Sequence, residues 1–180
     1  LYMSRDGGAT WSKTAAASSE WPVRSVVFGA GGVIYAGTLG AGLSVSRDGG
    51  NVWSQGAEPT VVGPFVACIA VDPKDPAIVY AGTSGGVIKS LDRGESWKPA
   101  LKGLPHGAVL ALAIDPADPD TLYAGTASGV YSSTDGGQNW QALDKGMFHR
   151  NVTSLLVDAQ DPHIVYAGTE GGGVFRYVRP

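Results

Sequence analysis

The octapeptide SRDGGATW, residues 4–11, returns three more times along this chain in closely related form. The later copies read SRDGGNVW at 46–53, SLDRGESW at 90–97 and STDGGQNW at 133–140. Each copy keeps Ser, Asp, the second Gly and Trp at the same four places, and its closing Trp follows the previous one by 42 to 44 residues. A spacing this regular is typical of a tandem array of structural units.

A second marker, the tetrapeptide YAGT, follows the same period and is independent of the octapeptide. The short apolar runs VACIAVD (66–72), VLALAID (109–115) and VTSLLVD (152–158) precede three of its copies and predict strands buried on both faces. A turn rich in Asp and Pro, DPKDPA at 72–77, separates the first of these runs from its YAGT strand. Four short strands in about 43 residues, with no helical periodicity, predict a blade of an all-β propeller. The YAGT copies occupy residues 35–38, 80–83, 123–126 and 166–169.

The repeat boundaries predict one β-propeller array over residues 1–180, made of four-stranded antiparallel blades with a turn at each octapeptide. The first residues supply only a third and a fourth strand, and the last ones supply three strands without the octapeptide turn. One interpretation is a piece of a longer array, and the other is a closed ring of four blades. The predicted units are 1–22 (incomplete blade), 23–65, 66–108 and 109–151 (complete blades) and 152–180 (terminal three strands).

Composition limits the classes of function. The chain has 27 Gly and 11 Pro, and only 16% of its residues are charged, which fits short strands and tight turns. A net charge of −3 provides no basic surface for nucleic acid. No apolar run approaches the roughly 20 residues of a membrane helix, so we expect no membrane insertion. Cys68 is alone in an apolar strand, which indicates a buried, inert thiol without a disulfide.

The octapeptide pattern S-x-D-x-G-x-x-W resembles the Asp box, also called the BNR repeat. This resemblance implies a β-propeller similar to those of sialidases, xyloglucan-active glycosidases, sortilin-type ectodomains and a photosystem II assembly factor. It covers nearly the whole chain and is specific for the fold, whereas the functions within this superfamily differ widely. The resemblance alone also implies a bacterial protein in an extracytoplasmic or secreted location.

We interpret the octapeptides as structural turns. Ser and Asp side chains can fix an Asx-type turn, Gly tolerates positive φ, and Trp offers a large apolar surface for packing. A catalytic group is rarely needed in identical copies, so we expect no catalytic residue in these turns. The predicted structural residues are Ser4, Asp6, Gly8, Trp11, Ser46, Asp48, Gly50, Trp53, Ser90, Asp92, Gly94, Trp97, Ser133, Asp135, Gly137 and Trp140.

The sequence favours a non-enzymatic binding or scaffold module over an enzyme. The arginines form no recognisable sialidase cluster, and most carboxylates belong to repeated turns. The alternative is a fragment of a sialidase-like or xyloglucanase-like glycoside hydrolase whose catalytic residues lie partly outside this chain. Neither hypothesis calls for a cofactor, and association into a larger ring is a further option.

A ligand-binding surface is predicted on the loops opposite the Asp boxes, because these loops vary between units. That surface would contact a protein or a glycan. Two equivalent loop histidines are too few ligands for a metal, so no metal site is expected. The predicted binding residues are Glu58, His106, Phe148, His149, Arg150 and Glu170.

Overall fold

The computed structural model describes residues 1–14, 22–57, 63–143, 146–148 and 150–179. Within these residues the chain forms three four-stranded antiparallel sheets, one three-stranded sheet and a two-stranded hairpin. The single helical element of the described residues is a short 3₁₀ turn, η1 (Ala30–Gly32). No described helix has the length and apolar character that a membrane crossing requires. The predicted all-β class is therefore confirmed.

Strands follow one another in space as they do in sequence. Every sheet is a meander in which each strand pairs with the next, in the strand order expected of a propeller blade. The strands are β1 (Tyr2–Met3) and β2 (Ser12–Lys13); β3 (Val23–Phe28), β4 (Ile34–Thr38), β5 (Leu43–Ser46) and β6 (Ser54–Ala57); β7 (Val66–Val71), β8 (Val79–Thr83), β9 (Gly86–Ser90) and β10 (Lys98–Pro99); β11 (Val109–Ile114), β12 (Leu122–Thr126), β13 (Gly129–Ser133) and β14 (Gln141–Ala142); and β15 (Val152–Val157), β16 (Ile164–Thr169) and β17 (Gly173–Val178).

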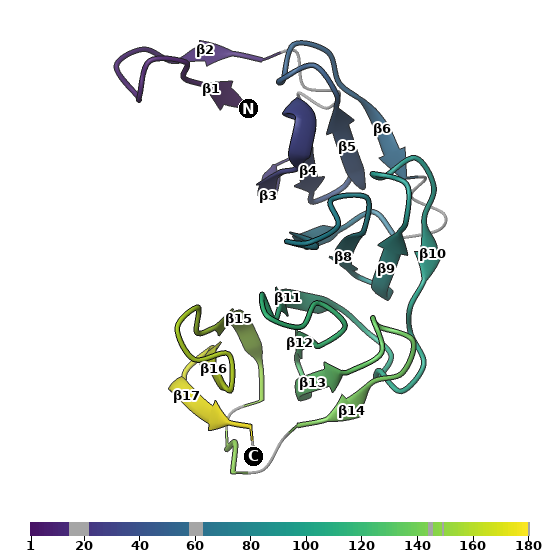
Figure 1. The fold of residues 1–180 in the computed structure, drawn as a ribbon, viewed down its shortest axis with the longest axis vertical. Helices are drawn as coiled ribbons and strands as arrows, with labels where there is room; N and C mark the ends of the chain where they lie inside the picture. The colour runs from purple at the N-terminus through teal and green to yellow at the C-terminus, as the bar shows by residue number, and fades with distance from the viewer. Residues whose placement is uncertain (15–21, 58–62, 144–145, 149, 180) are drawn as a thin grey trace.

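The sheets stand side by side along an open arc, with the two chain ends at its two extremities (Figure 1). First strands such as β3, β11 and β15 lie toward the hollow of the arc, and β6, β10 and β14 run along its outer rim (Figure 1). The structure thus shows the radial arrangement of a propeller without a closed ring.

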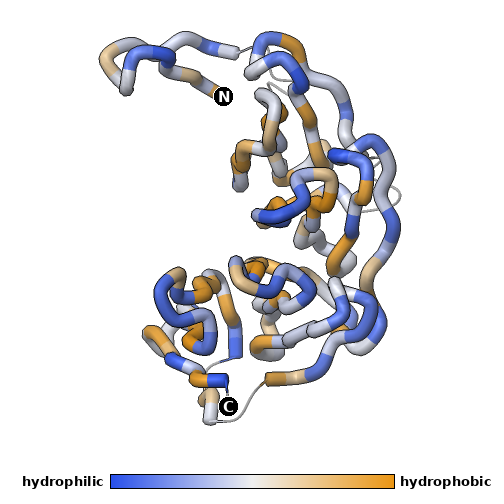
Figure 2. The backbone as a smooth tube through the Cα atoms, viewed as in Figure 1, coloured by the Kyte–Doolittle hydropathy of each residue, from blue (hydrophilic) through white to orange (hydrophobic). Residues whose placement is uncertain are grey.

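Apolar clusters between neighbouring sheets form the core. The second strand of each complete sheet, which carries the YAGT motif, is buried at every position. Its tyrosines Tyr35, Tyr80 and Tyr123 are at most 1% exposed. Hydrophobic segments alternate with hydrophilic ones along the tube in Figure 2, as short strands joined by polar turns require.

The first strands differ from expectation in one respect. We predicted that VACIAVD, VLALAID and VTSLLVD are buried on both faces, yet β15 exposes three of its six residues. β7 and β11 are also only partly buried. The physical reason is their place in the arc, since these strands border its open hollow (Figure 1).

Candidate functional site

Each octapeptide forms a turn whose polar side chains bond within the turn itself. In the second copy the Ser46 hydroxyl donates to Asp48 Oδ1 over 2.9 Å and accepts from the Gly50 amide over 2.8 Å. Asp48 Oδ1 also accepts from the Val52 amide over 2.9 Å. The Trp53 indole donates to the Gly50 carbonyl over 3.1 Å, and its side chain is buried. The serine and aspartate atoms are thus engaged in holding the turn.

The serine and aspartate bonds recur in the other three turns, whereas the indole bond to the second glycine recurs in the first and third turns and the Trp140 indole donates to the Ala100 carbonyl. In each, the serine hydroxyl donates to the aspartate and accepts from the second glycine. The pKa values of Asp6, Asp92 and Asp135 fall to about 2, chiefly because a side chain four residues later donates to the carboxylate. These groups stay ionised at neutral pH. A low pKa of this kind suits a fixed acceptor and does not suit a general acid.

The loops at the other end of each sheet lie together, as the connectivity predicts. The Leu39 amide donates to the Pro22 carbonyl, and the Gly40 amide donates to the Pro64 carbonyl over 2.8 Å. The Ser84 amide likewise donates to the Phe65 carbonyl over 3.0 Å. Turns between second and third strands therefore contact the segments that enter the first strands. These two sets of loops form one surface, which we call the loop face.

Four of the six predicted binding residues are described by the structure, and all four are exposed. Phe148 is 90% exposed, the largest value among the large hydrophobic side chains that the structure describes. His106, Arg150 and Glu170 are also exposed. Glu58 and His149 lie outside the described residues.

Hydrogen bonds join two loops of the loop face near Arg150. The Glu170 amide donates to the Asn151 carbonyl over 2.9 Å, and the Asn151 side-chain amide donates to Glu170 Oε2. The Asn151 Oδ1 atom is buried and has no hydrogen-bond partner among the described residues. The structure thus places Glu170 against the loop that carries Arg150, although the two positions are 20 residues apart in the sequence.

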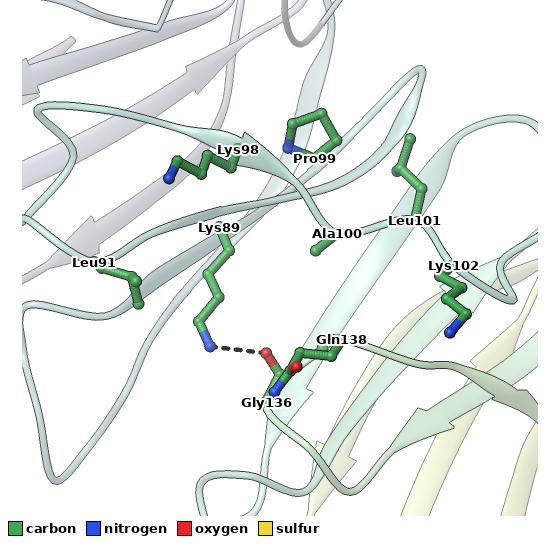
Figure 3. A pocket seen from close by; sticks show the side chains of 10 residues that line it. Lys89, Leu91, Lys98, Pro99, Ala100, Leu101, Lys102, Gly136 and Gln138 are labelled. Atoms are coloured by element: carbon green, nitrogen blue, oxygen red, sulfur yellow. Dashed lines mark hydrogen bonds between the residues drawn. The ribbon is translucent and has the colours of Figure 1, made fainter.

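A groove of about 440 Å³ that the sequence did not reveal lies between the second and third complete sheets (Figure 3). Lys89 reaches across it and donates to the Gly136 carbonyl over 2.8 Å, with its ammonium 5.1 Å from the centre of the Tyr80 ring. Lys98 and Lys102 lie on either side of Lys89 and point away from it (Figure 3). Burial lowers the Lys89 pKa against the opposing effect of nearby aspartates. These contacts explain Lys89 as a link between two sheets.

Two further grooves are lined mainly by apolar side chains. One, of about 330 Å³, lies between the β1–β2 hairpin and the first complete sheet, with Trp11, Phe28 and Trp53 in its lining. The other, of about 340 Å³, crosses β7, β11 and β15. Within the described residues, no group of three or more His, Cys, Asp or Glu side chains could hold a metal ion.

Comparisons with a protein-family model and with solved structures agree with the Asp-box turns and the radial sheets described above. The BNR/Asp-box repeat model matches residues 2–13 and 131–142. An ancestral GH74 enzyme superposes with a TM-score of 0.72 at 22% identity, covering 89% of this chain and 24% of that one. YCF48 from Cyanidioschyzon merolae superposes with a TM-score of 0.69 at 15% identity, covering 98% of this chain and 60% of that one. The computationally designed Ika4 protein superposes with a TM-score of 0.68 at 17% identity, covering 92% of this chain and 96% of that one.

These likenesses bear on the fold. This chain spans about a quarter of the length of the GH74 enzymes that it matches. A search of curated proteins gives no match to the sequence. The two matched repeats, the serine and aspartate bonds shared by the four turns and the radial sheets all lead to one conclusion. The chain has the blade architecture of a β-propeller and carries BNR/Asp-box repeats at residues 2–13 and 131–142.

Proposed function

We propose that this chain is a non-catalytic binding module that contacts a protein or glycan through its loop face. The observation that carries the proposal is the exposure of Phe148, which is 90% exposed in a loop on a frame of paired strands. An aromatic side chain held this far out of the core gains most when a partner covers it. Rigid frames with exposed loop residues are the usual design of binding surfaces.

The surroundings of Phe148 add polar groups of both charges. Arg150 follows it by two residues, and Glu170 is tied to the adjacent Asn151. Arginine and carboxylate groups beside an aromatic ring suit the hydroxyl groups and apolar faces of a sugar, and equally the mixed surface of a protein. The loop face therefore offers directional contacts as well as apolar area.

The Asp-box turns support the proposal from the opposite side. Their hydroxyl and carboxylate groups already bond to their own backbone in all four copies. A ligand contacting those atoms would have to replace existing bonds, and each lost bond costs about 0.5–1.5 kcal/mol. Groups on the loop face can be used at a smaller cost.

The test compares the intact chain with Phe148→Ala and Arg150→Ala on a glycan array and against immobilised candidate proteins, followed by titration of every hit. Val52→Ala is the matched control, because Val52 is 67% exposed on an Asp-box turn. We expect Phe148→Ala to weaken binding at least about tenfold, a hot-spot effect, and Val52→Ala to leave it unchanged. Equal binding by all four proteins contradicts the proposal.

The second candidate function is a part of a glycoside hydrolase, and the likeness to GH74 enzymes is the observation that favours it. Such an enzyme needs two carboxylates on opposite sides of the scissile bond. Glu170 is the described loop-face carboxylate that we would test first. Hydrolysis of xyloglucan or of a sialoside that disappears in Glu170→Gln would establish this candidate and reject the binding module.

A further inference from the structure

The third strand of every sheet carries one apolar residue whose burial depends on a neighbouring sheet. Leu43, Val87 and Val130 each lie opposite a glycine of the second strand, and their exposed fractions are 0%, 0% and 3%. Val174 occupies the same position in the last sheet, opposite Gly168, and is 72% exposed. One repeat position is thus buried three times and open once.

The covering residue is the valine that begins the first strand of the following sheet. Val66, Val109 and Val152 share apolar clusters with Leu43, Val87 and Val130, respectively. All three covering valines are at most 1% exposed. The equivalent residue of the first complete sheet is Val23, which is only half-buried. Val23 and Val174 are therefore the two halves of one contact that is made elsewhere three times.

The backbone approach at this contact is very close. A Cβ atom on Gly125 would lie 2.7 Å from Val152 Cγ1, and the equivalent glycines Gly37 and Gly82 meet the next sheet at similar distances. At Gly168 the added atom would meet only Ser154 of its own sheet. Gly168 therefore occupies a position where no neighbouring sheet lies in this structure. The missing side chain would allow a following sheet to approach as closely as the last sheet approaches Gly125.

The opposite end of the arc has the complementary exposure. Phe28 is 72% exposed, whereas Val157 at the same place in the last sheet is 6% exposed. Val26 is 41% exposed, and its equivalent Ile69 is 7% exposed. Both residues line the apolar groove between the first complete sheet and the β1–β2 hairpin. This face of the first complete sheet therefore has the apolar composition of a contact between two sheets. The β1–β2 hairpin beside it has only two strands and does not cover the face as a complete sheet would.

We propose that two copies of this chain associate head to tail, each placing its last sheet, β15–β17, against the first complete sheet of the other. Val174 of one copy then packs on Val23 of the second copy, as Val130 packs near Val152. Contacts between unlike ends close into a ring when the rotation allows it. The arc of Figure 1, with its two ends on the open side, has the shape that a second arc would complete.

The Asp-box turn of the first complete sheet gives a second contact of the same kind. Elsewhere the YAGT tyrosine of one sheet packs on the Asp-box glycine of the next: a Cβ on Gly137 would lie 3.3 Å from the Tyr80 ring. Gly50 has the Met3 sulfur as its neighbour instead. Tyr166 of the last sheet, which is only half-buried, is the tyrosine that would take this place from a second copy.

Strand pairing then completes the last sheet. β17 pairs with β16 over six residues, whereas β1 pairs with β2 over only two. β2 of the second copy can therefore leave β1 and serve as the fourth strand beside β17. Gln141 lies opposite Ser132 in the complete third sheet. By the same register, Ser12 of one copy lies opposite Arg176 of the other.

Mass in solution is the first test. The intact chain is expected at twice 18.5 kDa in light scattering coupled to size exclusion at about 50 µM. Val174→Lys places an ammonium at the buried contact and should weaken association about a hundredfold or more. Leu91→Lys is the matched control, because Leu91 is 63% exposed on the Asp-box turn of the second complete sheet, away from both proposed contacts, and it should remain dimeric. A monomeric intact chain, or a dimer that Val174→Lys leaves unchanged, overturns the proposal.

Cross-linking tests the strand register. In Ser12→Cys/Arg176→Cys, directly opposed positions bring the two Cα atoms to about 4.5–5.5 Å, within reach of a disulfide. Mild oxidation should then give a covalent dimer on a non-reducing gel. The control Ser12→Cys/Lys98→Cys should run as a monomer on the same gel, since Lys98 is exposed on β10, outside the proposed contact. Burial raises the Cys68 pKa to about 12, so this thiol stays unreactive. Covalent dimers in the control alone, or in neither protein, contradict the proposed register.

Discussion

Gly125→Ala tests the packing between sheets at the point of closest approach. The new methyl group would lie 2.7 Å from Val152 Cγ1 and 3.2 Å from Ala111 Cβ. Carbon atoms prefer about 3.5–4.0 Å, so the third and last sheets must separate or distort. Overpacking of this kind costs about 1–3 kcal/mol of unfolding free energy.

The lost flexibility of the unfolded chain offsets part of that cost, by about 0.4–1 kcal/mol. We therefore expect Gly125→Ala to lower the unfolding free energy by about 1–2 kcal/mol. For a chain of 180 residues this is a fall in Tm of about 2–8 °C. Circular dichroism during thermal and urea unfolding measures both quantities.

The repeat provides a matched control in Gly168→Ala. The added methyl group there meets only the Ser154 hydroxyl, which can rotate away. Both substitutions are made in Val174→Lys chains, so that the unfolding of single chains is compared. We expect Gly168→Ala to change the unfolding free energy by less than about 0.5 kcal/mol. Equal losses in the two proteins would refute the close-packing argument.

Three further predictions concern the Asp-box turns. Arg93 has φ 57° in the left-handed region, so Arg93→Gly should raise the unfolding free energy in urea by about 1 kcal/mol. Because the Asp135 pKa is lowered from its ordinary 3.8 to about 2, its contribution to the unfolding free energy is complete above pH 3.8 and is lost as the pH falls toward 2. Asp135→Asn should therefore weaken the pH dependence of the unfolding free energy, measured between pH 6 and pH 2. Trp140→Ala should cost about 3–5 kcal/mol in urea unfolding, and Trp11→Ala under about 1, because the two side chains are 3% and 64% exposed. A loss for Trp11→Ala as large as that for Trp140→Ala would contradict this account of the turns.

The repeat made much of the fold predictable. Two markers at one period locate the strands, since local turn chemistry fixes the Asp-box bonds without help from distant residues. The YAGT strand is readable for the same reason, as every complete sheet buries it alike.

Contacts between sheets could not be predicted in the same way. Lys89 occupies a position held by Val45 and Ser132 in other repeats, and its bond to Gly136 depends on how two sheets stand together. The partial exposure of β15 likewise follows from the hollow of the arc. The bonds between Glu170 and Asn151 join loops that no spacing rule relates. A residue whose contacts lie in another sheet has no pattern in the sequence around it that would predict those contacts.

The central claim is that Asp-box turns build the molecule and the loop face binds its ligand. Binding isotherms of Phe148→Ala and Asp135→Ala against one ligand from the array test it directly, at a temperature where both chains are folded. The account predicts that Phe148→Ala weakens binding at least about tenfold while Asp135→Ala binds like the intact chain. Lost binding in Asp135→Ala together with unchanged binding in Phe148→Ala would contradict it.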